Sequence, residues 1–236
     1  NRIRRRLREL NISSYLEYFK IIKDKPITHD EVVKFFDEVT TNETSFFRHE
    51  RQFIALQNMI IPEIIKLKNT KEISVWSAAA STGKEAYTIA MVLKSMPALA
   101  NYRLNILGTD LNQQVLKIAS NGEYDIKDFK DVPEEYKRYI EFDKEKGLAK
   151  IKRELRDLIN LKRFNLKDPF SMIPRMDVIF CRNVFIYFEK HTQKEIMSKF
   201  FDKLIPGGYF ILGHSETLHG VTDDFDKARK GYYPGY

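Results

Sequence analysis

The sequence predicts an α/β fold, with a parallel sheet that comes after a helical N-terminal segment. From residue 72 to about residue 212, short apolar runs alternate with helical patterns, which favours α/β over all-β architecture. The apolar run Glu72-Ile-Ser-Val-Trp76 is followed by the small residues Ser77-Ala-Ala-Ala-Ser-Thr-Gly83 and then by a helical pattern. Open α/β sheets form a nucleotide crevice in this way, because small residues let a ligand reach free backbone N–H groups.

The first 66 residues are expected to be helical and separate from the rest of the chain. Residues 12–22 have helical periodicity, and Thr28-His-Asp-Glu31 matches a capping box that begins a further helix. Residues 53–67 predict another helix, with Pro62 as a kink, and residues 66–71 form a polar connector. We therefore expect a helical N-terminal substrate-docking domain over 1–66 and a second domain over 72–236.

The second domain contains the predicted strands. Residues 104–109 form a strand that ends in Asp110, a helix covers 112–119, and Asn121-Gly122 stops it. The charged, irregular stretch after this helix predicts an insertion over about 125–163. Residues 176–181 form a strand, residues 191–204 a helix, and Pro206-Gly-Gly208 turns into a strand over 209–212. The core strands would thus be parallel, with their carboxyl ends at one edge.

Composition narrows the partners and the cell compartment. The single Cys181 excludes an intramolecular disulfide and fits a cytoplasmic location. No apolar run approaches the ~20 residues of a membrane span, and the histidines lack metal-site spacing, so we expect neither membrane insertion nor a bound metal. The net charge of +7 favours an acidic partner, whether nucleic acid, anionic membrane or protein. Five cations lie close together near the start of the sequence, and they could form either a docking surface for an acidic partner or a solvated terminus. They are Arg2, Arg4, Arg5, Arg6 and Arg8.

Polar residues at the predicted strand ends should rim one crevice. These are Ala78 to Glu85, Asp110, Arg182-Asn183-Val184 and His214-Ser-Glu216. A carboxylate at Asp110 can accept both hydroxyls of a ribose, although an Asp here is also a common helix N-cap. Because the Gly-rich dinucleotide fingerprint and the phosphate loop are both missing, the cofactor should carry adenosine without pyrophosphate. S-adenosylmethionine fits that description.

Six ordered segments resemble the CheR family of chemotaxis receptor methyltransferases. They are Thr41-Asn-Glu-Thr-Ser-Phe-Phe-Arg48, Trp76-Ser-Ala-Ala-Ala-Ser-Thr-Gly-Lys-Glu-Ala-Tyr87, Gly108-Thr-Asp-Leu111, Phe164-Asn-Leu166, Phe180-Cys-Arg-Asn-Val-Phe-Ile-Tyr-Phe188 and Gly213-His-Ser-Glu-Thr-Leu218. The resemblance implies a Rossmann-like, doubly wound methyltransferase sheet with a small all-helical N-terminal domain and a small β-subdomain. It also implies a monomeric protein-glutamate O-methyltransferase that esterifies acidic methyl-accepting chemoreceptor helices and releases S-adenosylhomocysteine.

The resemblance also assigns site residues by motif position. Arg48 and Tyr187 would stand near the transferable methyl group, although Tyr187 could equally be ordinary packing. The cofactor would be bound by Asn42, Thr44, Arg48, Glu85, Asp110, Asn165, Leu166, Asn183 and Val184, with Glu85 at its amino group and Asp110 at its ribose.

Two residues depart from the family pattern, which usually has Glu and Pro where this chain has Lys84 and Ala86. A Lys84 side chain that points inward would affect cofactor affinity, whereas an outward one changes little.

Two alternatives to the receptor enzyme stay open. One is a methyltransferase that acts on nucleic acid, for which the aromatic and basic surface expected of a base-flipping enzyme is not obvious. The other is a weakly catalytic, cofactor-binding signalling module.

Overall fold

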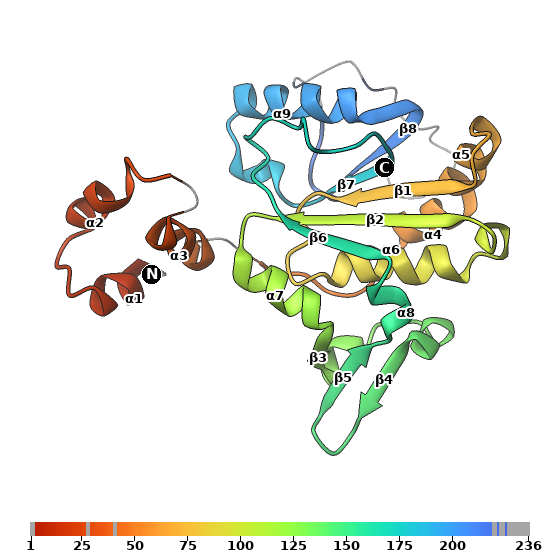
Figure 1. Ribbon diagram of the computed structural model, residues 1–236, viewed down its shortest axis with the longest axis horizontal. Coiled ribbons are helices and arrows are strands. Elements are labelled where there is room, and N and C mark those ends of the chain that lie inside the picture. The colour runs from red at the N-terminus through yellow and green to blue at the C-terminus, as the bar shows by residue number, and fades with distance from the viewer. Residues whose placement is uncertain (1–2, 27–28, 40–41, 219–220, 222–224, 226–236) are drawn as a thin grey trace.

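The computed structural model describes residues 3–26, 29–39, 42–218, 221 and 225, and its centre is a five-stranded parallel sheet (Figure 1). The strand order is β6-β2-β1-β7-β8, from β6 (Ile159–Arg163) through β2 (Arg103–Asp110), β1 (Glu72–Ser77) and β7 (Met176–Cys181) to β8 (Leu204–Leu212). All four pairings are parallel, so the strands end at a common edge. The predicted α/β fold is confirmed.

Two apolar cores cover the two faces of this sheet, because successive strand residues point to opposite sides. Val75 and Ile106 pack with α6 (Lys84–Ser95) on one face, whereas Trp76 and Ile179 pack with α9 (Lys190–Lys203) on the other. Every residue of β7 is buried, as expected for a central parallel strand covered on both faces. The predicted turn at 206–208 instead lies within β8, where the pairing register with β7 shifts.

Helix α7 (Gln113–Asn121) connects β2 to the insertion. The Asn112 side chain accepts hydrogen bonds from Gln114 N and Val115 N and caps its start, while Gly122, at φ 63°, ends it. The predicted Asn121-Gly122 stop is therefore confirmed. Glycine suits this position because the left-handed conformation is costly for residues that carry a Cβ.

Three N-terminal helices form a cluster beside the sheet unit (Figure 1). They are α1 (Ile3–Glu9), α2 (Tyr15–Ile22) and α3 (Asp30–Val39). The buried Glu31 carboxylate binds them together, since it accepts hydrogen bonds from Arg6 Nε at 3.0 Å and Tyr18 Oη at 2.8 Å. Arg6 therefore belongs to the interior of this cluster rather than to a surface strip. Thr28 of the predicted capping box lies outside the described residues.

The helical residues 51–67 pack on the sheet, whereas the sequence pattern placed them in the N-terminal domain over 1–66. Helix α4 (Arg51–Ala55), the π-helix η1 (Leu56–Ile60) and α5 (Ile61–Leu67) run in succession, with the π-helical turn directly before Pro62. Their apolar residues, including Phe53 and Ile64, share one core with β1 and β7. These helices therefore pack against the sheet, which buries their stripe of apolar side chains. The assignment of docking to the N-terminal segment stays a prediction.

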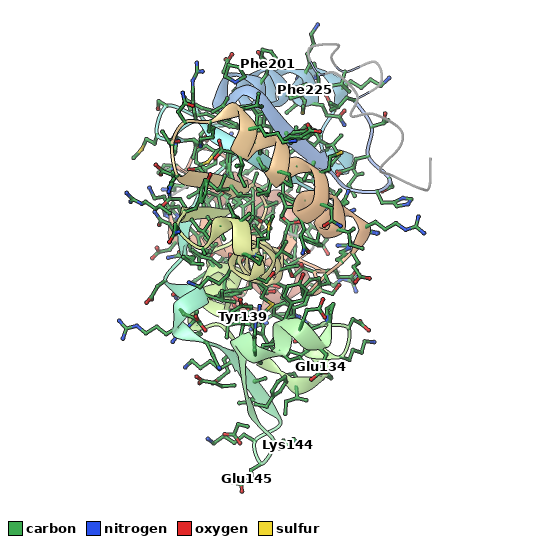
Figure 2. The ribbon with its side chains drawn as sticks, turned by 90° about the vertical axis from the view of Figure 1, so that its right-hand side faces the viewer. Glu134, Tyr139, Lys144, Glu145, Phe201 and Phe225 are labelled. Carbon is green, nitrogen blue, oxygen red and sulfur yellow. The ribbon has the colours of Figure 1, made fainter. Side chains whose placement is uncertain are left out.

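The insertion is a small antiparallel sheet with the order β3-β5-β4. It comprises β3 (Glu123–Asp125), β4 (Ile140–Asp143) and β5 (Leu148–Ile151), flanked by the short helices η3 (Ile126–Phe129), η4 (Glu134–Tyr139) and α8 (Arg153–Arg156). Figure 2 shows Lys144 and Glu145 at its far tip, away from Phe201 on α9. Residues 159–163 form the edge strand of the main sheet, so the insertion is shorter than the expected 125–163. No helix among the described residues is long and apolar enough to span a membrane.

Candidate functional site

One pocket lies where the predicted strand ends meet. Its lining includes Asn42, Thr44, Arg48, Glu85, Asp110, Asn183 and Val184, all of which the family resemblance assigned to the site. These residues come from the segment before α4, from the start of α6, and from the ends of β2 and β7. The parallel sheet explains their meeting, since each strand ends at the same edge. Their individual binding roles remain predictions.

Glu85 lies at the start of α6, behind a glycine that forms a tight turn. Gly83 has φ 85°, and a Cβ there would stand 2.7 Å from Ala119 Cβ, so the turn has no room for a side chain. The Glu85 carboxylate accepts a hydrogen bond from Ser77 Oγ at 2.7 Å and pairs with Arg182 Nη1 at 3.1 Å. Glu85 is 9% exposed, and burying a polar group is costly unless such partners satisfy it. Glu85 is thus a preorganised acceptor at the pocket wall.

Arg182 is a residue to which the sequence assigned no role of its own. Its buried guanidinium pairs with Glu85 and donates a hydrogen bond to the Arg48 carbonyl oxygen, and it lies 5.5 Å from the centre of the Phe53 ring. Burial lowers the pKa of Arg182, while the neighbouring Glu85 charge opposes that shift. A single side chain therefore connects the α6 side of the pocket to the segment that carries Arg48. The sequence placed Arg182 on the rim of the crevice, beside Asn183, but gave no sign of these contacts.

Asp110 lies at the end of β2 with both carboxylate oxygens engaged. Oδ2 accepts from Ser81 N at 2.8 Å, and Oδ1 accepts from Asn112 N at 2.9 Å. Burial raises the pKa of Asp110, and the backbone hydrogen bonds oppose this. Since Asn112 is the N-cap of α7, Asp110 is not needed as the cap. An ionised carboxylate has about four acceptor sites, so Asp110 can accept a further hydrogen bond from a ligand hydroxyl beside its backbone donors.

The segment 42–48 closes the pocket from the other side. Ser81 Oγ donates to the Asn42 carbonyl oxygen at 2.9 Å, and Arg48 Nη1 donates to the Glu43 carbonyl oxygen at 3.0 Å. Phe46 and Phe47 are buried in the core, and they anchor this segment. The Arg48 side chain is therefore carried by a fixed backbone and is half-buried at the pocket.

Three predicted site residues do not line this pocket. Tyr187 is 60% exposed in the short helix η5 (Phe185–Tyr187), just beyond Val184. Leu166 is buried in the core around Trp76, and the Asn165 side chain accepts a hydrogen bond from Lys167 N at 3.0 Å in a local turn. Their proposed contacts with cofactor or substrate stay predictions.

The two departures from the family pattern face away from the pocket. Lys84 Nζ pairs with Asp128 Oδ2 at 3.0 Å and lies over the Tyr124 ring, so it points toward the insertion. Ala86 is fully buried in the core. The outward orientation of Lys84 leaves the charge of the pocket unchanged.

Two family models and several curated relatives agree with the resemblance. The model described as "CheR methyltransferase, SAM binding domain" matches residues 42–233, and "CheR methyltransferase, all-alpha domain" matches residues 1–40. A chemotaxis protein methyltransferase of Vibrio parahaemolyticus is 35% identical over 82% of this chain and 71% of its own length. One of Borreliella burgdorferi is 34% identical over 91% of this chain and 77% of its own. A solved glycopeptide N-methyltransferase aligns with a TM-score of 0.43 and 13% identity, over 75% of this chain and 53% of its own.

Proposed function

The chain belongs to the CheR methyltransferase family, and from this premise we propose that it methylates glutamate side chains of chemoreceptor signalling helices, forming methyl esters. The observation that carries the proposal is the meeting of Glu85, Asp110 and Arg48 in one pocket at the carboxyl edge of the sheet. Two carboxylates suit a cofactor with a cationic amino group and a ribose, and an arginine suits a substrate carboxylate.

The donor set fits S-adenosylmethionine, the family's cofactor. Glu85 would bind its amino group, and Asp110, whose carboxylate lies beside the Ser81 and Asn112 amides, would accept the ribose hydroxyls. Asn183 and Val184 would form the adjoining wall of the cofactor pocket. When bound, the cofactor supplies an electrophilic methyl group on a sulfonium.

The protein then needs to position a carboxylate rather than activate it. A glutamate has a reference pKa near ~4.3 and is already ionised at neutral pH, so no general base is required. Arg48 would orient the incoming carboxylate, and Tyr187 would provide a hydrogen bond or an aromatic wall beside it. Both side chains would act by orientation and by excluding water.

The exposed cations of the N-terminal cluster support an acidic protein partner. Arg4, Arg5 and Arg8 are exposed on α1, although Arg5 is also paired with Glu9. Receptor helices that offer glutamates would be steered by such charges, an effect that salt screens. We expect initial rates with receptor to fall as salt rises, and less steeply for Arg4→Gln/Arg8→Gln. Rates that stay flat from low to high salt would exclude this steering.

The test is a methyl-ester assay with labelled cofactor on receptor-containing membranes. We expect base-labile label on receptor glutamates from the wild-type protein and background label from Asp110→Asn. Label that enters RNA instead would favour the nucleic-acid alternative. Calorimetric binding of S-adenosylhomocysteine without any methyl ester on receptor would favour the weakly catalytic module.

A further inference from the structure

The Glu216 carboxylate is a centre of backbone hydrogen bonds at the end of β8. It accepts four N–H groups, from Asn183 at 2.7 Å and from Val184, Phe185 and Gly213 at 2.8 Å each. Three of these donors are consecutive residues that come after β7. A carboxylate with several backbone N–H donors makes charge-assisted bonds, which are shorter and stronger than neutral ones.

The three consecutive donors form an anion-binding nest that the protein fills with its own carboxylate. Asn183 has φ 59°, the left-handed conformation that lets successive N–H groups converge. Asparagine adopts this conformation more readily than most residues that carry a Cβ, and surrounding contacts hold the turn in it. Glu216 makes those contacts, because its two oxygens neutralise the converging N–H dipoles.

Gly213 leaves the space that the carboxylate occupies. A Cβ at Gly213 would lie 2.6 Å from Glu216 Oε2 and 2.8 Å from Asn183 N, both too close for a real contact. The glycine is therefore required for steric reasons rather than for its backbone angles. The absence of a side chain at Gly213 thus allows the Glu216 carboxylate to reach the turn after β7.

This turn carries the residues that the reaction needs. Asn183 and Val184 line the pocket, Phe185 is buried, and Tyr187 comes next with its side chain exposed. We propose that Glu216 is a positioning residue, whose carboxylate fixes the 183–185 turn and thereby the cofactor wall of the pocket. The inference rests on the proposed function only in taking this pocket as the cofactor site.

The test combines removal of the carboxylate with its replacement from solution. Glu216→Ala should weaken S-adenosylhomocysteine binding at least about tenfold, a loss of about 1.4 kcal/mol. Because the emptied nest can accept a carboxylate from solution, acetate at constant ionic strength should lower the Kd of the variant for S-adenosylhomocysteine. The restored affinity should reach at least about a third of the wild-type value. Glu195→Ala is the matched control, since Glu195 is exposed on α9; it should bind like wild type and ignore acetate.

Two results of the Glu216→Ala titration would overturn the proposal. One is Glu216→Ala binding within about twofold of wild type, and the other is a weakened affinity that acetate does not improve, which indicates a general loss of packing. If Glu216→Ala does not fold, Glu216→Gln takes its place. Its amide fills the nest but turns N–H groups toward two of the donors, so it should weaken binding about fivefold or more without responding to acetate. Wild-type affinity in this variant would refute the role.

These titrations contain no receptor. A wild-type protein that binds S-adenosylhomocysteine but methylates no receptor would contradict the proposed function and leave the Glu216 result interpretable. Normal receptor methylation by Glu216→Ala at a cofactor concentration below the wild-type Kd would contradict the positioning role alone.

Discussion

Replacing Arg182 with methionine tests whether the pocket depends on its buried ion pair. Methionine keeps an unbranched aliphatic stem but removes the guanidinium, so Glu85 loses its 3.1 Å partner and the Arg48 carbonyl oxygen loses a donor. The Arg182 and Glu85 side chains are 3% and 11% exposed, so water cannot readily replace the lost charge. The variant leaves a carboxylate without its counter-charge.

The magnitude depends on this burial. Removing one partner of a buried pair costs about 3–5 kcal/mol. For a domain of this size, 1 kcal/mol lowers Tm by about 2–4 °C, so Arg182→Met should lower Tm by about 6–20 °C. The matched control is Arg153→Met, whose pair with Asp157 is 84% and 65% exposed. Exposed pairs contribute about 0–1 kcal/mol, so this variant should lose less than about 4 °C.

The assay is thermal unfolding of both variants and the wild type, monitored by circular dichroism in one buffer without ligand. A Tm for Arg182→Met within about 2 °C of wild type would refute the reasoning, because the carboxylate would then be satisfied without its arginine. Equal losses in both variants would indicate that charge removal, rather than burial, sets the effect.

Three further predictions concern other parts of the chain. Arg48→Ala should reduce kcat/KM for receptor about tenfold or more while S-adenosylhomocysteine affinity changes less, and unchanged turnover would remove Arg48 from substrate orientation. Gly83→Ala should lower stability in urea unfolding by roughly 2 kcal/mol or more, because the left-handed turn and the Ala119 contact both exclude a Cβ; a loss below about 0.5 kcal/mol would contradict this. Burial raises the pKa of Glu31, but hydrogen bonds from Arg6 and Tyr18 outweigh this effect and lower the pKa overall. Its stabilising contribution should be complete above pH 4.5 and disappear as the pH falls below that, so the Tm difference between wild type and Glu31→Gln should shrink on acidification. A difference that is constant with pH would argue against the ion pair.

Much of the sheet and of the pocket could be predicted, because both depend on local patterns. Apolar runs indicated the strands, and the carboxyl ends of parallel strands lie at one edge of the sheet. Glu85 and Asp110 each follow such a strand end, so they could be placed near each other without knowledge of any contact. The Asn121-Gly122 helix stop is also local, since one left-handed glycine sets it.

The features that could not be predicted depend on partners distant in sequence. Arg182 and Glu85 are 97 residues apart, and Glu216 reaches across 31 to 33 residues to the turn after β7. No periodicity encodes such pairs. For the same reason, the apolar stripe of residues 53–67 predicted a helix but not that it packs on the sheet. The cation Arg6 could likewise not be distinguished from its exposed neighbours.

A crystal structure of the protein with S-adenosylhomocysteine tests the central claim most directly. We predict that the ligand's amino group lies within hydrogen-bond distance of Glu85 and that its ribose hydroxyls contact Asp110, with Arg48 facing the sulfur side. A ligand bound elsewhere, or one in this pocket that leaves both carboxylates without contact, would contradict the assignment of this pocket to methyl transfer.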